Sequence, residues 1–154
     1  MKEIKEQTQL LAAVKKHCQM RGARLTSIRE QVLRLVLAYP DVVKAYDVLT
    51  DLQKQRGTPV APPTVYRALE FWVEMGVLHR AESLNGFVLC KEFAHEHVSV
   101  ITNCRECGRT EELPADKPVA ELLDFCSDKG FLLSSDPIVL AGLCADCQED
   151  THEH

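Results

Sequence analysis

Two Cys-x-x-Cys pairs constrain the fold of this 154-residue chain more than any other feature of its sequence. Both pairs lie in the second half, at Cys104–Cys107 and Cys144–Cys147, with 36 residues between them. Four thiolates in two such pairs can close a tetrahedral shell around one Zn²⁺ ion. We therefore predict a structural zinc site, with a small folded unit between the pairs. A thioredoxin-like redox motif needs only one pair, and two disulfides suit a reducing compartment poorly.

The start of the chain and its cysteine count indicate a compartment. The first ten residues contain no apolar stretch, so we expect no signal peptide. No run approaches the roughly 18 apolar residues of a membrane span, and we expect no membrane partner. Seven cysteines, an odd number, favour a reducing cytoplasm in which thiols bind metal. We predict a cytoplasmic protein of one domain or two small ones.

Charge is divided unevenly along the chain. The net charge of −5 argues against nucleic-acid binding when the chain is taken whole. Residues 1–83, however, carry 13 Lys and Arg against 9 Asp and Glu, whereas residues 84–154 carry 5 against 14. This asymmetry is expected when only the first half meets an anionic partner, although chance variation between two surfaces produces it as well.

Hydrophobic spacing predicts helices throughout the first half. Four are expected, over residues 4–20, 27–39, 45–55 and 62–75. The second begins at Ser27-Ile-Arg-Glu30, which fits a capping box. The fourth opens with Pro62 and Pro63 and ends before Gly76, because proline suits the first helical positions and glycine the C′ position.

The fourth helix carries the clearest functional signal of this half. Its apolar face, at helical spacing, consists of Val65, Leu69, Trp72 and Val73. The first turns then present outward Thr64, Tyr66, Arg67 and Glu70. Polar and aromatic residues at the start of the last helix of a helix–turn–helix are typical of a recognition helix in the DNA major groove. A solvated helix face is the more general explanation.

The periodicity changes after Gly76. Two short strands, over 77–79 and 86–90, are predicted as a hairpin, and helices followed by a hairpin make a winged helix–turn–helix. A helix is expected over 116–129. Further strands are predicted over 97–103, 109–113, 131–134 and 137–141. The fold class is therefore α+β.

A second set of residues can bind metal, and it consists of His79, Cys90, His97 and Glu112. The first two lie on the predicted hairpin and the others on strands of the second half. One thiolate, two imidazoles and one carboxylate suit four-coordinate Zn²⁺ better than the oxygen-rich sites of Fe²⁺ or Mn²⁺. No compact spacing rule joins them, and singly each is as easily a surface or core residue. Ligands from both halves would make the angle between the halves depend on metal occupancy.

Several segments resemble the ferric uptake regulator family of bacterial metal-dependent repressors, in family order from about residue 10 to 147. They are Arg24–Leu33, Ala45–Leu49, Pro62–Leu69 and the paired cysteines. Within the family, the segments most similar to the zinc uptake regulator branch are Pro62–Leu69, Val88–Cys90 and Gly142–Cys147.

The resemblance implies a fold and a function. It implies a winged-helix DNA-binding domain over residues 1–83 and an α/β dimerisation and metal-binding domain over 84–154. It implies a homodimer that binds double-stranded operator DNA when zinc-loaded and represses zinc-uptake genes. It implies no catalysis and no small-molecule substrate.

The resemblance also assigns residues, with two Zn²⁺ ions expected per subunit. The structural zinc maps onto Cys104, Cys107, Cys144 and Cys147. The regulatory zinc maps onto His79, Cys90, His97 and Glu112. Glu111 is adjacent, and a shift of one residue would exchange it with Glu112. The expected DNA-contacting residues are Arg24, Thr64, Tyr66 and Arg67.

Other interpretations stay open at this point. The same architecture can sense Fe, Mn, Ni or peroxide, and His95, beside Glu96, suggests an extra or iron-type ligand. Because Cys90 is present, we take His95 as an outer or surface group. His152 and His154 can bind a further metal weakly, although a solvated tail is the simpler interpretation.

Two further classes of zinc protein fit the sequence less well. A zinc hydrolase or deaminase would need an open zinc position and the pattern H-x-E…P-C-x-x-C, whereas Asn103 precedes Cys104 here. A zinc-ribbon interaction module without DNA binding leaves the fourth helix and the charge asymmetry unexplained.

Overall fold

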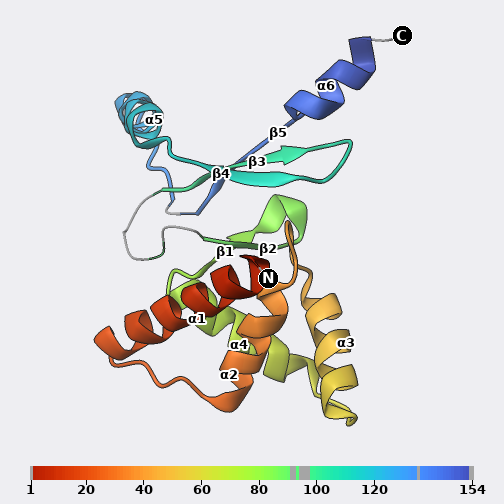
Figure 1. The fold of residues 1–154 in the computed structure, drawn as a ribbon. Helices are drawn as coiled ribbons and strands as arrows, with labels where there is room; N and C mark the ends of the chain where they lie inside the picture. Colours follow the sequence, from red (N-terminus) through yellow and green to blue (C-terminus); the bar gives the residue numbers. More distant parts are fainter. Residues whose placement is uncertain (1, 91–92, 94–97, 135, 153–154) are drawn as a thin grey trace.

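Four helices and a hairpin form the first half of the molecule (Figure 1). The computed structural model describes residues 2–90, 93, 98–134 and 136–152. The helices are α1 (Lys2–Met20), α2 (Ser27–Leu37), α3 (Ala45–Arg56) and α4 (Pro62–Glu74). The hairpin consists of β1 (Leu78–Ala81), the 3-10 turn η1 (Glu82–Leu84) and β2 (Gly86–Leu89). This order of elements confirms the predicted winged helix–turn–helix.

One apolar core joins the helices of this half. Trp72 of α4 has no exposed surface, and its indole N–H donates to the carbonyl oxygen of Arg29 in α2 at 3.0 Å. Leu33 and Leu52 bring α2 and α3 to the same core and are also fully buried. Burial of an aliphatic side chain of this size stabilises the fold by roughly 1.5–3 kcal/mol. The helix α4 is therefore fixed along one face and leaves the opposite face open.

The helix ends differ from the prediction in one detail. Thr26, and not Ser27, caps α2, because its hydroxyl accepts from the N–H of Arg29. The capping box expected at Ser27–Glu30 is thus wrong by one residue. At α4 the prolines occupy the first positions and Gly76 takes a φ of 77°, as predicted.

A three-stranded sheet forms the second half, in the order β4-β3-β5. Its strands are β3 (Val100–Cys104), β4 (Thr110–Leu113) and β5 (Ile138–Gly142). The central β3 pairs antiparallel with β4 and parallel with β5. Two helices, α5 (Asp116–Asp128) and α6 (Ala145–His152), lie at opposite ends of the sheet in Figure 1.

Two elements of this half were not predicted correctly. Residues 131–134 form no strand, and Leu132 is 92% exposed, so the apolar run that suggested a strand finds no sheet to join. The helix α6 has no apolar stripe after Cys147, and its sequence gave no sign of it.

The hairpin lies between the helices and the sheet (Figure 1). A second apolar cluster joins the two halves there, and it contains Val42, Ala81, Leu84, Val88, Ile101 and Val139. The boundary predicted between residues 83 and 84 falls inside η1, and the division into two domains at that point stays a prediction. None of the helices in the described part of the chain has both the length and the apolar character needed to cross a membrane.

The close approach of residues 42 and 43 to the hairpin gives a test of this packing. A Cβ on Gly86 would lie 2.5 Å from Val42 Cγ1 and 2.7 Å from the carbonyl oxygen of Val43. We expect Gly86→Ala to destabilise the first half by about 1–3 kcal/mol, because the backbone must shift. Urea unfolding followed by far-UV circular dichroism measures this loss. Gly142→Ala is the control, since its Cβ would meet nothing within 4 Å. An equal loss of unfolding free energy in both variants would contradict the close packing of residues 42 and 43 against Gly86.

Candidate metal centre

The four thiols of the Cys-x-x-Cys pairs gather at one end of the sheet. The parallel register of β3 and β5 sets Cys104 opposite Gly142, which brings the two pairs side by side. The four sulfur atoms lie within 4.8 Å of one another, and Cys107 Sγ is 3.7 Å from Cys144 Sγ. A tetrahedral shell with Zn–S bonds of about 2.3 Å has S–S edges of about 3.8 Å. The thiols therefore fit a zinc ion.

The thiols of this cluster differ in acidity. Backbone hydrogen bonds from Cys107 and Cys144 lower the pKa of Cys104 to about 6. The N–H of Cys144 donates to this sulfur at 3.4 Å. The pKa of Cys147 is raised instead, first by its hydrogen bond to Cys144. Because metals bind the thiolate form, the lowered pKa of Cys104 favours zinc binding by this thiol.

A second cluster of metal-binding side chains lies between the two halves. His79 comes from β1, Cys90 follows β2, and Glu112 comes from β4. Their ligand atoms lie within 4.8 Å of one another. Glu112 Oε1 is 3.8 Å from Cys90 Sγ, and Glu112 Oε2 is 3.5 Å from His79 Nε2. Tetrahedral zinc has sulfur–oxygen edges of about 3.6 Å and nitrogen–oxygen edges of about 3.4 Å, so the three side chains are close enough together to bind one zinc ion.

The described part of the chain brings together three of the four predicted regulatory ligands. His97 lies outside the described residues, as does His95. Cys90 is fully buried, and the side chains of His79 and Glu112 are 15% and 9% exposed. The cluster is thus screened from bulk water by the hairpin and the sheet, which strengthens interactions between charged ligands.

Ser99 is a member of this cluster that the sequence analysis missed. Its hydroxyl lies 2.9 Å from His79 Nε2 and 3.1 Å from Glu112 Oε1, and the residue is 2% exposed. A buried polar side chain needs partners, and Ser99 finds them in two of the candidate ligands. A polar residue inside the apolar run Val98–Ile101 was the available signal.

The structure separates Glu112 from its neighbour Glu111. Successive side chains of a strand point to opposite faces, so only one of the two can face the hairpin. Glu112 faces it and joins the cluster. Glu111 is exposed and lines a cavity of about 370 Å³ on the other face, beside Leu113 and Leu140.

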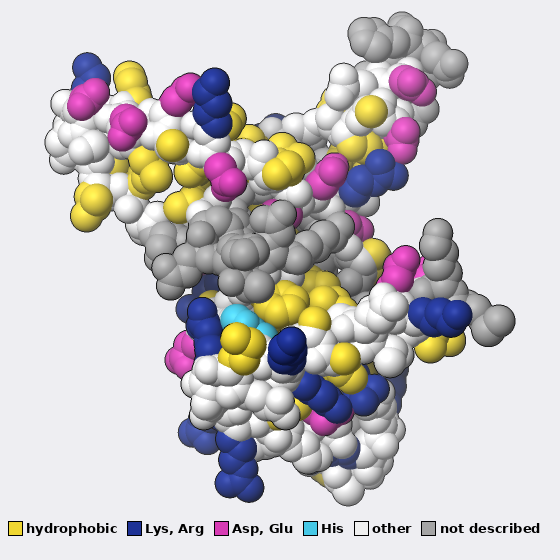
Figure 2. Space-filling model, turned by 60° about the vertical axis from the view of Figure 1, so that its left-hand side comes forward, with side chains coloured by type: hydrophobic (Ala, Val, Ile, Leu, Met, Phe, Trp, Pro, Cys, Tyr) yellow, Lys and Arg dark blue, Asp and Glu magenta, His cyan; other side chains and the backbone are white. Residues whose placement is uncertain are grey.

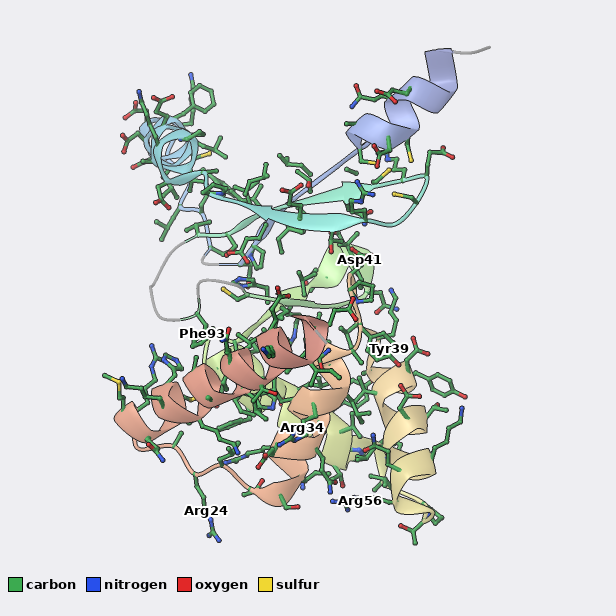
Figure 3. All side chains as sticks on the ribbon, in the orientation of Figure 1. Arg24, Arg34, Tyr39, Asp41, Arg56 and Phe93 are labelled. Atoms are coloured by element: carbon green, nitrogen blue, oxygen red, sulfur yellow. The ribbon has the colours of Figure 1, made fainter. Side chains whose placement is uncertain are left out.

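The predicted DNA-contacting residues lie on open surface of the first half. Tyr66 and Arg67 are exposed in the first turns of α4, and Thr64 is half-buried there. Arg24 is exposed in the loop between α1 and α2 and extends away from the second half (Figure 3). On the face drawn in Figure 2, most Lys and Arg lie on the first half and most Asp and Glu on the second. The charge division seen in the sequence is therefore also a division in space.

Known proteins are similar to this chain in sequence and in fold. The model of the ferric uptake regulator family matches residues 20–140. This chain belongs to that family. The "Zinc uptake regulation protein" of Escherichia coli K12 is 39% identical over 142 residues, which cover 92% of this chain and 82% of that protein.

Solved structures of the ferric uptake regulator family show the same fold. A zinc uptake regulator complexed with zinc and DNA matches with a TM-score of 0.85 and 37% identity, covering 95% of this chain and 97% of that one. Holo XcZur matches with a TM-score of 0.80 and 37% identity, covering 92% of this chain and 98% of that one. Apo XcZur matches with a TM-score of 0.54 and 36% identity, covering 92% of this chain and 97% of that one. Since the identities are nearly equal, the backbone of this family member matches the holo structure more closely than the apo structure.

The separation of the two glutamates can be tested by zinc binding. Glu112→Ala should weaken zinc binding at the second cluster by at least about tenfold, because the site loses a donor or its support. Glu111→Ala, the matched control, should leave the affinity unchanged. A competition titration against a chromophoric zinc chelator, with the four-thiol site filled, measures both. Equal effects of the two substitutions would show that the strand register is wrong.

Proposed function

We propose that this chain is a zinc-responsive transcriptional repressor that binds operator DNA as a dimer when zinc-loaded and represses zinc-uptake genes. The observation that carries the proposal is the cluster of His79, Cys90 and Glu112, which joins the hairpin of a winged helix to the sheet of the other half. The similarity to a zinc uptake regulator complexed with zinc and DNA supports it.

The ligands of the proposed regulatory site are His79, Cys90, His97 and Glu112. A zinc ion bound there would supply coordination bonds to both halves at once. A thiolate among the donors favours zinc over the iron and manganese alternatives. The four thiols form the proposed structural site, and because they fill all four positions of a tetrahedral zinc they leave none for a reacting water. This supports a structural role for that site and not a catalytic one.

The first half can transmit the position of His79 to α4 as a rigid unit. Only Met75, Gly76 and Val77 separate α4 from β1. The N–H of Val77 donates to the carbonyl oxygen of Trp72 at 2.9 Å, and the N–H of Cys90 donates to that of Val77 at 2.8 Å. Holding His79 and Cys90 against Glu112 therefore sets the direction of α4 relative to the sheet.

The proposed DNA-contacting residues are Arg24, Thr64, Tyr66 and Arg67. Arg67 carries the planar fork that recognises a guanine edge, and Tyr66 can contact a thymine methyl group or a phosphate. The positive first half supplies attraction to the phosphate backbone, whereas the acidic second half is repelled by it. A dimer whose two α4 helices are held at a fixed spacing can enter successive major grooves of a pseudo-palindromic operator.

The exposed apolar side chains of the second half support dimerisation through it. They are Leu113, Leu122, Phe125, Phe131, Leu132, Leu140 and Leu143. Figure 2 shows several apolar side chains gathered around the end of the molecule that carries α5. Burying such a patch against a second copy removes it from water. We place the protein in the cytoplasm, because operator DNA is found there and the reducing conditions keep its thiols available to zinc.

Replacement of Cys90 tests the regulatory site. Cys90→Ser should abolish zinc-dependent binding to the operator while one zinc per subunit stays on the four-thiol site, because the soft donor between the halves is lost. Gel shifts with graded free zinc, with a chelator control, measure the response. Cys126→Ser is the matched control, since Cys126 belongs to neither cluster, and it should respond as the wild type does. A full zinc response in Cys90→Ser would move the sensor elsewhere.

Replacement of Arg67 tests the recognition helix. Arg67→Ala should weaken binding to the operator by about 1–3 kcal/mol and relax its sequence preference. Arg67→Lys keeps the charge but not the fork, so it should retain non-specific binding and lose specificity. Competition between operator and unrelated DNA at fixed salt separates the two effects. Unchanged affinity and specificity for the operator in Arg67→Ala would show that α4 is not the recognition helix.

A further inference from the structure

A short segment between α2 and α3 makes a further polar connection between the halves. Asp41 accepts two hydrogen bonds through Oδ1, from the backbone N–H of Thr110 at 2.9 Å and from the Thr110 hydroxyl at 3.4 Å. Asp41 belongs to the first half, whereas Thr110 begins β4 of the second. Figure 3 shows Asp41 directly beneath the sheet. A carboxylate acceptor makes such bonds stronger than those between neutral groups.

The segment that carries Asp41 is firmly held in the first half. We call residues 39–44 the strap. The Tyr39 hydroxyl donates to Asp51 of α3 at one end of the strap. Val43 exchanges two backbone hydrogen bonds of 2.8 Å with Phe87 of β2. Lys44 Nζ donates to the carbonyl oxygen of Asn85 at 3.1 Å. Because the strap is bonded to both α3 and the hairpin, a restraint on Asp41 is a restraint on the whole winged helix.

The contact and the metal cluster use the same face of the same strand. Thr110 and Glu112 are two positions apart on β4, so their side chains point to one face and their Cα atoms lie about 7 Å apart. The apolar cluster of Val42, Ala81 and Ile101 already joins the halves. Asp41–Thr110 adds a directional contact that needs no metal, and together with the metal cluster it restricts the angle between the halves.

We propose that Asp41 and Thr110 form a metal-independent latch that positions the winged helix against the sheet and thereby sets how much free zinc is needed for DNA binding. This inference rests on the proposed function. The backbone that contains the latch matches a zinc uptake regulator complexed with zinc and DNA at a TM-score of 0.85 and apo XcZur at 0.54, and on this ground we assign the latch to the DNA-binding arrangement.

Population linkage gives the expected effect. The latch favours the DNA-binding arrangement with or without zinc, so its loss lowers the fraction of zinc-free protein already in that arrangement. Zinc then has to drive a larger change, and its apparent affinity falls by the same factor. At saturating zinc the arrangement is filled again, so the affinity for DNA is restored.

The test compares Asp41→Ala with the wild-type protein in operator gel shifts across buffered free zinc. We expect the zinc concentration at half-maximal binding to rise about three- to tenfold, with operator affinity at saturating zinc unchanged. Asp47→Ala is the matched control, because it removes an exposed aspartate from the same half and should not move the midpoint. Thr110→Val keeps the N–H and should act weakly, and Asp41→Asn, which keeps one acceptor oxygen, should lie between.

Amide hydrogen exchange of Thr110 reports the latch directly, measured by NMR on protein whose four-thiol site is filled and whose regulatory site is empty. The Thr110 amide should exchange faster in Asp41→Ala, while the Cys104 amide, bonded to Arg109, should not change. The proposal is overturned if the zinc midpoint stays unchanged in Asp41→Ala and Asp41→Asn, or if operator affinity at saturating zinc falls as far as it does at limiting zinc. If wild-type protein shows no zinc-dependent operator binding, the proposed function fails, whereas the Thr110 exchange still decides whether the latch exists.

Discussion

The meeting of His79, Cys90 and Glu112 between the hairpin and the sheet is the interaction on which the rest of this molecule depends. Burying an imidazole, a thiol and a carboxylate together is costly unless something compensates their charges and lone pairs. Ser99 supplies two hydrogen bonds, and a cation would supply the remaining compensation. The site is therefore built so that the arrangement of the two halves and the filling of the cluster stabilise each other.

The two candidate zinc sites differ in function because one lies within the second half and the other lies between the halves. The four thiols lie within the second half and join the end of β3 to the start of α6, so they hold one unit together. The mixed cluster draws its ligands from both halves. Affinity at the first site adds to the stability of a fold, whereas affinity at the second adds to the stability of one arrangement of two folds. Zinc can thus be a permanent structural ion at the four-thiol site and a regulatory ion at the mixed cluster.

Local features of the sequence were predictable, and those made by tertiary pairing were less so. Pro62 and Gly76 marked the ends of α4 because they act within one turn of the chain. Glu112 is 22 residues from Cys90, and only strand pairing brings them together; the family resemblance, and not spacing, pointed to that set. Asp41 gave no signal at all, since its partner is 69 residues away. The strand predicted over 131–134 was wrong because an apolar run that is exposed, as at Leu132, has the same sequence pattern as a buried one.

The position of β4 at the edge of its sheet has a consequence for solubility. An edge strand offers unpaired backbone groups to any other strand, and such edges promote aggregation unless they are covered or charged. Asp41 covers the first N–H of β4, and the exposed Glu111 places negative charge beside the rest. If the Asp41–Thr110 contact breaks when zinc leaves the cluster between the halves, the first N–H of this edge becomes available to another strand. The negative charge of Glu111 would then oppose the pairing of two such edges with each other.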